Sequence, residues 1–348
     1  ASIADLQNDS VNWWIKTNTS SEEMTILNNG TLSNGNGIIT ADFSNANNYY
    51  TKYYWSVNVT DGFNWINKTF SFTTQIQPSP WFDINWKYRR KMTIDYQNVI
   101  GNQTDFPVLI AIEDENLSQK IQPNGEDILF TDYFGNKLSH EIESYNNQTG
   151  SLIAWVNIPT LSATINTTFF MYYGKENSTD QQNITGTWKN NYKMIQHLNE
   201  NSGIHLDSTS NNNHGTPQNG LNQNSQGKIN GADEFNGTNE YIEISANSIT
   251  QDPMTISWWM NNPTGEDEIL FMDRDTYNGN QGIDIFRGWG DPFVVRGSGV
   301  TAVVSNADYI DEWVYVSVVF NGTKAKIYRN GQLDASGTID PVVSSTYN

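Results

Sequence analysis

Neighbouring carboxylates are the residues of this chain best placed by type to support hydrolytic chemistry. They form two compact clusters, Glu113-Asp114-Glu115 and Glu266-Asp267-Glu268. Glycoside hydrolysis uses an acid and a nucleophile or base roughly 5–10 Å apart, and a strand supplies them from one face in patterns such as Glu-x-Asp-x-x-Glu. No such pattern occurs in the chain. We therefore interpret both clusters as turn residues and predict that the chain is not an enzyme.

Histidine with nearby carboxylates is the second pattern with chemical potential. His140-Glu141-Ile142-Glu143 partly matches a zinc motif, but it lacks a second histidine four residues on and lies between strand-like runs rather than on a helix. The other histidines, His197, His205 and His214, are scattered along the chain. A zinc site would need them to converge, so we interpret all four histidines as structural.

One loop is rich in the oxygen atoms that bind calcium. Residues 207–215 read DSTSNNNHG, and Ca²⁺ takes six to eight oxygens from carboxylates, amides and carbonyls. Asp207 is the best single ligand candidate, with Asp233-Glu234 and Asp273-Arg274-Asp275 as further ones. The alternative is an ordinary Asn-rich turn. Calcium is the only cofactor that the sequence predicts.

Tryptophan could provide a platform for a sugar ring. Trp258 and Trp259 are consecutive on an expected strand, so their side chains should face opposite sides, one in the core and one available to a ligand or a neighbouring domain. Trp13 and Trp14 are also consecutive, so we expect one of them in the core and the other available to a ligand or a neighbouring domain. Trp289, in the Gly-rich RGWGD stretch, is the best candidate for an exposed sugar or partner contact, with packing as the alternative.

The charge balance excludes several classes of partner. The 348 residues carry 38 acidic and 19 basic side chains, a net charge of −19, whereas nucleic acids and anionic lipids attract basic surfaces. Cysteine is absent, which removes disulfide and thiolate chemistry. No apolar run of about 18 residues predicts a membrane span. The chain begins at Ala1 without Met or an apolar leader, which indicates a processed chain or a fragment.

Asn, Ser and Thr supply most of the polarity, and they form many Asn-x-Ser/Thr sequons. Sequons mark candidate glycan sites in secreted proteins. Chance alone would produce several in so Asn-rich a chain, but together they favour an extracellular glycoprotein. The candidate attachment residues are Asn8, Asn18, Asn29, Asn58, Asn67, Asn102, Asn116, Asn147, Asn166, Asn177, Asn183, Asn236 and Asn321.

The elements that must position these residues are strands. Residues 53–60 and 68–74 alternate polar and apolar side chains around Asp61-Gly62, which predicts consecutive strands. The stretch YYWSVNVTDG…FSFTT in residues 1–74 resembles the last strands of fibronectin type III or immunoglobulin-like domains. Such sandwiches span about 100 residues, so a first strand is expected to be missing. Residues 75–80, QIQPSP, are predicted to be a proline linker.

Residues 81–187 contain six ordered motifs: WKYRRKMTI, FPVLI, GEDILFTD, HEIESYN, IAWVNIPTLS and TTFFMYYG. In these motifs the segment is similar to an uncharacterised β-domain of archaeal and bacterial surface proteins. The resemblance implies a β-sandwich but no chemistry. The basic cluster Arg89-Arg90-Lys91 is interpreted as a solvated strand edge, which basic side chains protect from aggregation.

Residues 188–348 contain the strand-like runs MTISWWM and EWVYVSVVF and a hairpin around Asn330-Gly331, the strongest short hairpin signal. The order of these motifs resembles a laminin-G-like, concanavalin A-like jelly roll. The resemblance implies one bound Ca²⁺, which we place at the loop of Asp207. It also implies closing strands after the hairpin, so the jelly roll is expected to be incomplete at its end and to leave an open edge.

The sequence therefore predicts an all-β chain of three tandem sandwiches. The expected function is a structural or adhesive protein of the cell surface, such as a subunit of an S-layer, a filament or an adhesin, of archaeal type. Its expected partners are copies of itself, other surface proteins and glycans, and strands donated between subunits would complete its open edges. The alternative is a carbohydrate-binding module of a larger secreted protein, and a catalytic domain outside this stretch is a third hypothesis.

Overall fold

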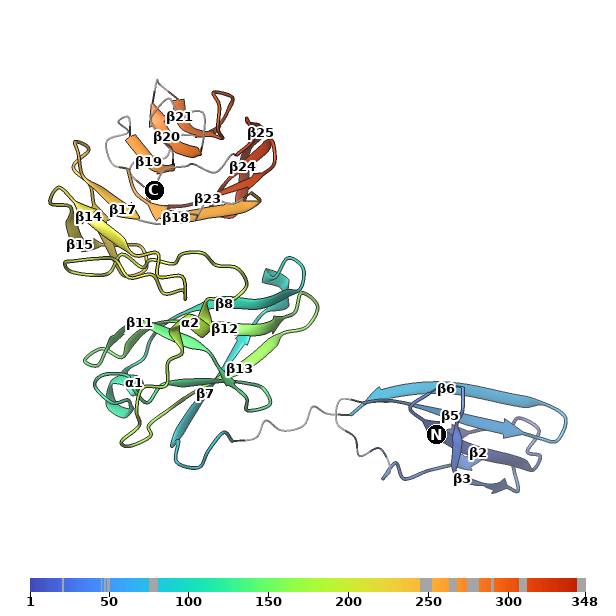
Figure 1. The fold of residues 1–348 in the computed structure, drawn as a ribbon. Helices are drawn as coiled ribbons and strands as arrows, with labels where there is room; N and C mark the ends of the chain where they lie inside the picture. The colour runs from blue at the N-terminus through green and yellow to red at the C-terminus, as the bar shows by residue number, and fades with distance from the viewer. Residues whose placement is uncertain are drawn as a thin grey trace. The chain divides into compact units, whose positions relative to one another are not determined.

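The computed structural model describes residues 1–20, 22–44, 46, 48, 51–74, 81–244, 252–262, 268–273, 282–288, 291–306 and 312–342. The chain is all-β, as predicted, and its sheets are antiparallel (Figure 1). It separates into two compact units, Ala1–Pro80 and Trp81–Asn348. The predicted linker at 75–80 lies outside the described residues.

The first unit is built on one four-stranded sheet in the order β3-β2-β5-β6. The two predicted alternating runs form its paired strands β5 and β6. The two-residue strands β1 and β4 form a second, small sheet. The bounds are β1 Ser2–Ile3, β2 Val11–Asn18, β3 Thr25–Leu32, β4 Gly37–Ile38, β5 Lys52–Thr60 and β6 Trp65–Thr73.

The core of this unit lies on one face of the sheet. Trp13 on β2 packs there against Val57 on β5, while its neighbour Trp14 lies on the opposite face, as the alternation of a strand requires. On β6, Ile66 pairs with Val59 of β5, and Phe70 pairs with Trp55 of β5. Both β6 side chains lie on the core-facing side of the sheet, yet both are exposed. The small sheet β1-β4 therefore covers only part of the apolar face.

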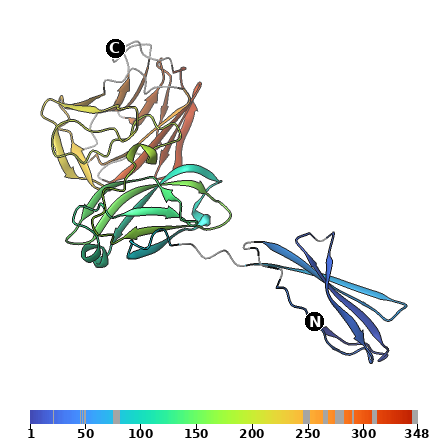
Figure 2. The same cartoon turned by 60° about the horizontal axis from the view of Figure 1, so that its bottom comes forward.

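The second unit begins with a sandwich of two sheets, in the orders β10-β9-β13-β7 and β11-β12-β8 (Figures 1 and 2). All six motifs of the middle segment contribute to it, and the basic cluster lies on the edge strand β7, as predicted. The bounds are β7 Tyr88–Ile94, η1 Tyr96–Asn98, β8 Gln103–Glu113, α1 Glu115–Lys120, β9 Leu129–Asp132, β10 Lys137–Leu138, β11 His140–Asn146, β12 Ser151–Leu161, β13 Thr167–Tyr173 and α2 Ile184–Thr187.

Alternation on β12 separates the inside of this sandwich from its outside. Leu152, Ala154 and Val156 are fully buried in the core between the sheets, because successive side chains of a strand point to opposite faces. Trp155 therefore lies on the outer face, opposite Glu141 of β11 in the strand register. The outer face of this sheet carries the polar network described below.

Residues 188–214 contain no strand, and only His205 forms an isolated bridge, to Gly215. After this coil the chain forms the last sandwich. Its two four-stranded sheets run β18-β23-β24-β25 and β19-β20-β21-β22, beside the pairs β14-β17 and β15-β16. The bounds are β14 Gly215–Gln218, β15 Asn222–Gln226, β16 Gly231–Glu234, β17 Tyr241–Ile244, β18 Met254–Met260, β19 Glu268–Asp273, β20 Ile283–Gly288, β21 Asp291–Arg296, β22 Ala302–Val304, β23 Val314–Asn321, β24 Lys324–Arg329 and β25 Gln332–Thr338.

Two sequence expectations for this sandwich are confirmed. Trp258 packs on the core, stacked on Phe293, whereas Trp259 faces outward. The turn between β24 and β25 has positive φ at both central residues, 48° at Asn330 and 80° at Gly331. That is the type I′ geometry that Asn-Gly favours, because both residues tolerate a left-handed backbone.

Candidate functional site

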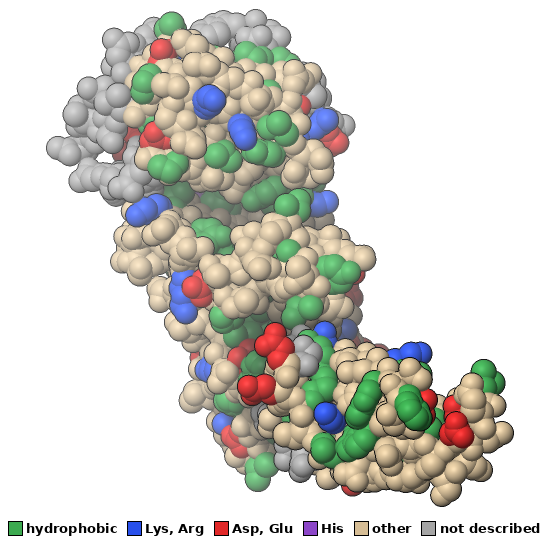
Figure 3. All heavy atoms as spheres, turned by 90° about the vertical axis from the view of Figure 1, so that its right-hand side faces the viewer, with side chains coloured by type: hydrophobic (Ala, Val, Ile, Leu, Met, Phe, Trp, Pro, Cys, Tyr) green, Lys and Arg blue, Asp and Glu red, His purple; other side chains and the backbone are tan. Residues whose placement is uncertain are grey.

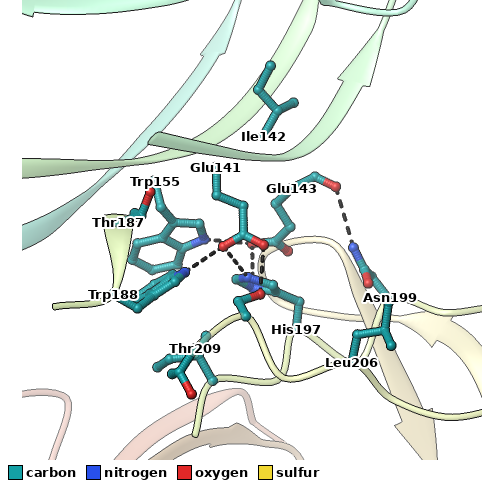
Figure 4. Close-up of polar contacts among 12 residues, drawn as sticks. Glu141, Ile142, Glu143, Trp155, Thr187, Trp188, His197, Asn199, Leu206 and Thr209 are labelled. Atoms are coloured by element: carbon teal, nitrogen blue, oxygen red, sulfur yellow. Dashed lines mark hydrogen bonds and ion pairs between the residues drawn. The ribbon is translucent and has the colours of Figure 1, made fainter. Parts of the chain in front are cut away.

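The most highly organised polar site in the second unit begins on β11. Glu141 and Glu143 project from the outer face of the sheet, while Ile142 between them points away toward the sandwich core (Figure 4). A bulge between Ile142 and Ser144 shifts the strand register. The two carboxylates thus approach the same point outside the sheet, and their side chains are only 9% and 3% exposed.

Indole and hydroxyl donors hold these carboxylates. Trp188 Nε1 donates to Glu141 Oε2 at 2.5 Å, and Ser208 Oγ donates to Glu141 Oε1 at 2.7 Å. Trp155 Nε1 donates to Glu143 Oε2 at 2.8 Å. Two of the donors belong to the coil of residues 188–214. Buried carboxylates need such partners, because an unpaired charge away from water is strongly disfavoured.

His197 of the same coil lies between the two carboxylates. Its Nε2 is 3.2 Å from Glu141 Oε2, its Nδ1 is 3.1 Å from Glu143 Oε2, and the side chain is 12% exposed. Burial disfavours the charged ring, but hydrogen bonds and charges from both carboxylates outweigh it and raise the pKa of His197 to about 9. The ring is therefore an imidazolium at neutral pH, with both nitrogens donating.

The pKa of Glu141 shifts in the opposite direction. Burial opposes the charge on Glu141, yet hydrogen bonding and attraction from His197, with help from Ser208 and Trp188, lower the pKa of its carboxyl group. Two carboxylates and one imidazolium carry a net charge of −1, which the indole and hydroxyl donors partly compensate. All three groups are engaged, so the arrangement can fasten the coil to β11 and leaves no free acid or base.

A second histidine in the coil is bound in a similar way. His205 Nδ1 lies 2.9 Å from Glu200 Oε2, and its Nε2 lies 2.8 Å from Asp233 Oδ2, with His205 and Asp233 fully buried. Burial opposes protonation, but Asp233 and Glu200 outweigh it and raise the pKa of His205. The contact with Asp233 is a close ion pair rather than an aligned hydrogen bond, since neither oxygen of Asp233 has a hydrogen-bond partner among the described residues. This clamp joins the coil to β16.

The predicted separation of the histidines is only partly correct. His140 is fully buried on the core side of β11 beside Phe130, and burial lowers its pKa to about 4. It therefore points away from Glu141 and Glu143, and the zinc-like pattern is a strand alternation, as the sequence indicated. His197 and His205, interpreted as scattered, instead lie in two clamps. Glu200 lies five residues before its partner His205, but nothing in the sequence around either histidine identified the more distant Glu141, Glu143 and Asp233.

Asp207 is the centre of the loop predicted to bind calcium. Its carboxylate accepts hydrogen bonds from the backbone N–H groups of Ile195, Thr209 and Asn213 at 2.8–2.9 Å and from Thr209 Oγ1 at 2.7 Å. Both oxygens thus have two donors each, and a cation would have to displace them. Calcium at Asp207 stays a prediction. In the part of the chain that the structure describes, no three His, Asp or Glu side chains are arranged to hold a metal ion.

These hydrogen bonds make Asp207→Asn a specific test. The amide would turn N–H groups toward backbone donors, and unmatched buried donors cost about 1–3 kcal/mol. We expect a loss of thermal stability in EGTA, measured by differential scanning calorimetry, and an equal loss in CaCl₂ would contradict calcium at Asp207. If Ca²⁺ stabilised the natural chain but not the variant, calcium would be a ligand of Asp207.

The other predicted residues are dispersed. Asp114 caps α1 and pairs with Arg90 at 2.8 Å, and Glu113 is exposed at the end of β8. Residues 266, 267, 274 and 275 lie outside the described residues, as does Trp289. Trp259, by contrast, is 36% exposed beside Tyr315.

Most candidate glycan sites lie at the surface. Asn18 is half-buried, with its side-chain amide donating to the backbone oxygen of Glu23. Asn58 is the exception, only 7% exposed, on a face where Trp14 of β2 stacks on Trp65 of β6 across the strand that carries it. The remaining sites are exposed: Asn8, Asn29, Asn67, Asn102, Asn116, Asn147, Asn166, Asn177, Asn183, Asn236 and Asn321. Figure 3 shows that most of one face is neither hydrophobic nor charged.

Comparisons with known proteins cover the second unit in two stretches. Residues 124–214 match a family described as a domain of unknown function (DUF2341), and residues 236–348 match the concanavalin A-like lectin/glucanases superfamily. No curated protein matches the chain, and neither does any solved structure. The second match confirms the predicted jelly roll. The first continues past residue 187 and includes both His197 and His205. None of the described helices is long and apolar enough to cross a membrane.

Proposed function

We propose that the chain is part of an extracellular structural or adhesive protein of the cell surface. The observation that carries the proposal is the buried clamp of His197 between Glu141 and Glu143, which fastens the coil after the middle sandwich to that sandwich. Surface proteins of this kind must keep the segments of each module attached under load. A buried ion pair with several hydrogen bonds resists opening, since removal of any partner leaves an uncompensated charge.

The contacts of Glu141 also indicate where the middle module ends and the next module begins. The predicted boundary at residue 187 would separate Glu141 from its donors on Trp188 and Ser208. The matched DUF2341 stretch includes residues 188–214, which supports a boundary near residue 214. We infer that the middle module extends over residues 81–214 and that the jelly roll follows it.

A structural role accords with the state of the acidic groups. In the described residues, the most closely grouped buried carboxylates, Glu141 and Glu143, are held by an imidazolium, and their hydrogen-bonding capacity is largely used. We propose no catalytic role for them. The superfamily that matches the jelly roll is described as one of lectins and glucanases. We propose that this chain resembles the lectins in function and has no enzymatic activity.

Self-association is proposed through the first unit. Ile66 and Phe70 lie on the core-facing side of β6 and remain exposed, and apolar faces of this kind favour association. The order β3-β2-β5-β6 supports an immunoglobulin-type arrangement, in which four strands of one sheet face a second sheet. A strand donated by another copy would pair with β6 and lie beside these exposed side chains.

Location outside the cell has a direct test in the sequons. We expect glycopeptide mass spectrometry of the native protein to find glycans on exposed sites such as Asn147 and Asn236 and none on Asn58, whose side chain is packed under two indole rings. Replacement of Asn147 by Gln should remove one glycan mass, while Asn58→Gln should leave the glycan mass unchanged. Absence of glycan at every site would contradict the glycoprotein assignment.

A second function, carbohydrate binding, is favoured by the lectin/glucanase match together with an exposed aromatic pair on the jelly roll. Lectin sites combine a few polar groups with apolar contact surface. The proposed function as an adhesin and the carbohydrate-binding function are compatible, because an adhesin can hold its partner through a glycan.

A further inference from the structure

The outward face of the sheet β18-β23-β24-β25 carries an aromatic pair. Trp259 and Tyr315 are register partners on adjacent strands, with ring centroids 5.3 Å apart and planes inclined by 46°. Each is 36% exposed. The Tyr315 hydroxyl lies 2.9 Å from Ser257 Oγ, within hydrogen-bonding distance, which fixes the ring. Trp258, not Trp259, packs on the core of the sandwich. Core packing therefore does not explain why a tryptophan occupies position 259.

A hollow of about 570 Å³ opens beside this pair. Its volume lies in the range of small-molecule sites. The turn between β24 and β25 forms one wall, and Asn330 Oδ1 accepts a hydrogen bond from the Tyr315 backbone N–H at 3.0 Å. The amide nitrogen of Asn330 is thereby left as a donor. The lining residues are Lys228, Trp259, Trp313, Tyr315, Asn330 and Gly331.

The charge of the hollow differs from that of the chain. Lys228 is the single charged residue among its lining residues, in a chain whose net charge is −19. The Lys228 ammonium lies 5.6 Å from the centroid of the Trp259 ring, a cation–π distance. It therefore lies over the ring of Trp259, and its flexible side chain could turn to meet an anionic group on a ligand that stacks there.

We propose that this hollow is a binding site for an acidic sugar, in which the ring of the sugar stacks on Trp259 and Tyr315 and its carboxylate or sulfate group pairs with Lys228. The proposal rests on the second proposed function, carbohydrate binding, and names its site and ligand class. Aromatic faces suit the C–H side of a pyranose because both are apolar, and Asn330 can donate to a sugar hydroxyl. A neutral sugar would offer Lys228 no anionic group to pair with.

Isothermal titration of the full chain with three hexasaccharides tests the proposal. The probes are an oligogalacturonate, a sulfated galactan fragment and a neutral galactan fragment. We expect at least one acidic probe to bind at least about tenfold more tightly than the neutral one. Whichever acidic probe binds more tightly identifies the anionic group as carboxylate or sulfate, and either result supports the site.

Variants then locate the binding. Trp259→Ala and the more conservative Trp259→Phe should weaken binding of the acidic probe, the former by about tenfold or more, as expected for a central aromatic contact. Lys228→Gln should bring the acidic probe to the affinity of the neutral one. The matched controls are Lys326→Gln, an exposed lysine of the same sheet, and Tyr241→Ala, an exposed tyrosine of β17; neither should change the affinity.

The contrary outcomes are distinct. If the acidic probe binds and Trp259→Ala retains full affinity, carbohydrate binding stands and this site is wrong. If the neutral probe binds as tightly and Lys228→Gln has no effect, the ligand class is wrong. If none of the three binds the natural chain, and an array of neutral and acidic glycans gives no signal, both the site and the carbohydrate-binding function fail.

Discussion

Replacement of Glu141 by Ala should lower the free energy of opening of the coil of residues 188–214 by about 3–5 kcal/mol, the usual result of removing one partner from a buried ion pair. The change leaves the buried His197 ring with Glu143 as its remaining carboxylate in the clamp and leaves Trp188 Nε1 and Ser208 Oγ without their acceptor. Hydrogen exchange of peptides from the coil and from β11 measures this local opening. A local probe is needed because a chain of several modules does not unfold in one transition.

The matched control is Glu113→Ala. Glu113 lies at the end of β8, in the same sheet as Glu141 of β11, but its side chain is exposed. Surface substitutions usually change stability by less than about 0.5 kcal/mol. If Glu141→Ala changed the opening free energy no more than Glu113→Ala did, the clamp would not hold the coil in place.

Alkaline pH should release the same clamp. The ring of His197 has a pKa near 6.5 when unfolded and about 9 when folded. A raised pKa means that the stabilisation is fully present below pH 6.5 and is lost as the pH rises through about 9. A shift of this size corresponds to about 3 kcal/mol. His205 acts in the same direction, because its pKa is also raised.

The acid side has the opposite sign. The pKa of Glu141 is lowered from 4.5, so its contribution is present above that value and is lost as the pH falls through the folded pKa. Attachment of the coil should therefore be strongest between about pH 4.5 and 6.5. Hydrogen exchange of the coil from pH 6.5 to 9.5, corrected for intrinsic exchange, should show falling protection.

The His197→Gln variant provides the control for this profile. It should be less stable at pH 6.5 and should lose most of the alkaline slope. Nuclear magnetic resonance of the ring protons gives an independent reading: His197 should titrate near pH 9, and His140, which is buried without a carboxylate partner, near pH 4. Titration of His197 close to 6.5 would show that the two carboxylates do not enclose it.

The strands could be predicted from the sequence because alternation is a local signal. The runs at 53–60 and 151–156, the Asn330-Gly331 turn and the opposite orientation of Trp258 and Trp259 all follow from backbone periodicity and turn chemistry. The sequence could not predict how much of the apolar face of the sheet β3-β2-β5-β6 is covered. The covered area depends on how the two-residue strands β1 and β4 pack on that sheet.

The His197 clamp could not be predicted because its members are far apart in the sequence. Glu141 and His197 are separated by 56 positions, and the coil that carries His197 has no periodicity to reveal which face it presents. The HEIE stretch was interpreted only as an incomplete zinc motif, although alternation on a strand places Glu141 and Glu143 on the same face. Asp207 was predicted to be a calcium ligand, and that stays a prediction; in the structure its carboxylate accepts hydrogen bonds from Ile195, Thr209 and Asn213.

The structural role makes the attachment between modules the property that matters most. The contact of His205 with Asp233 supplies one such attachment, because it joins the coil of residues 188–214 to β16. The exposed face of β6 offers a contact for a second copy, and the aromatic hollow of the jelly roll offers a contact for a glycan. These features lie on different modules, which suits a protein that links surfaces through separate sites.

Electron microscopy of material shed from the source cells, with antibody labelling of this chain, tests the proposed function most directly. The account predicts ordered filaments or a lattice in which the chain recurs as the repeating unit at the cell surface. Isolated particles without order, or labelling confined to the cell interior, would contradict it.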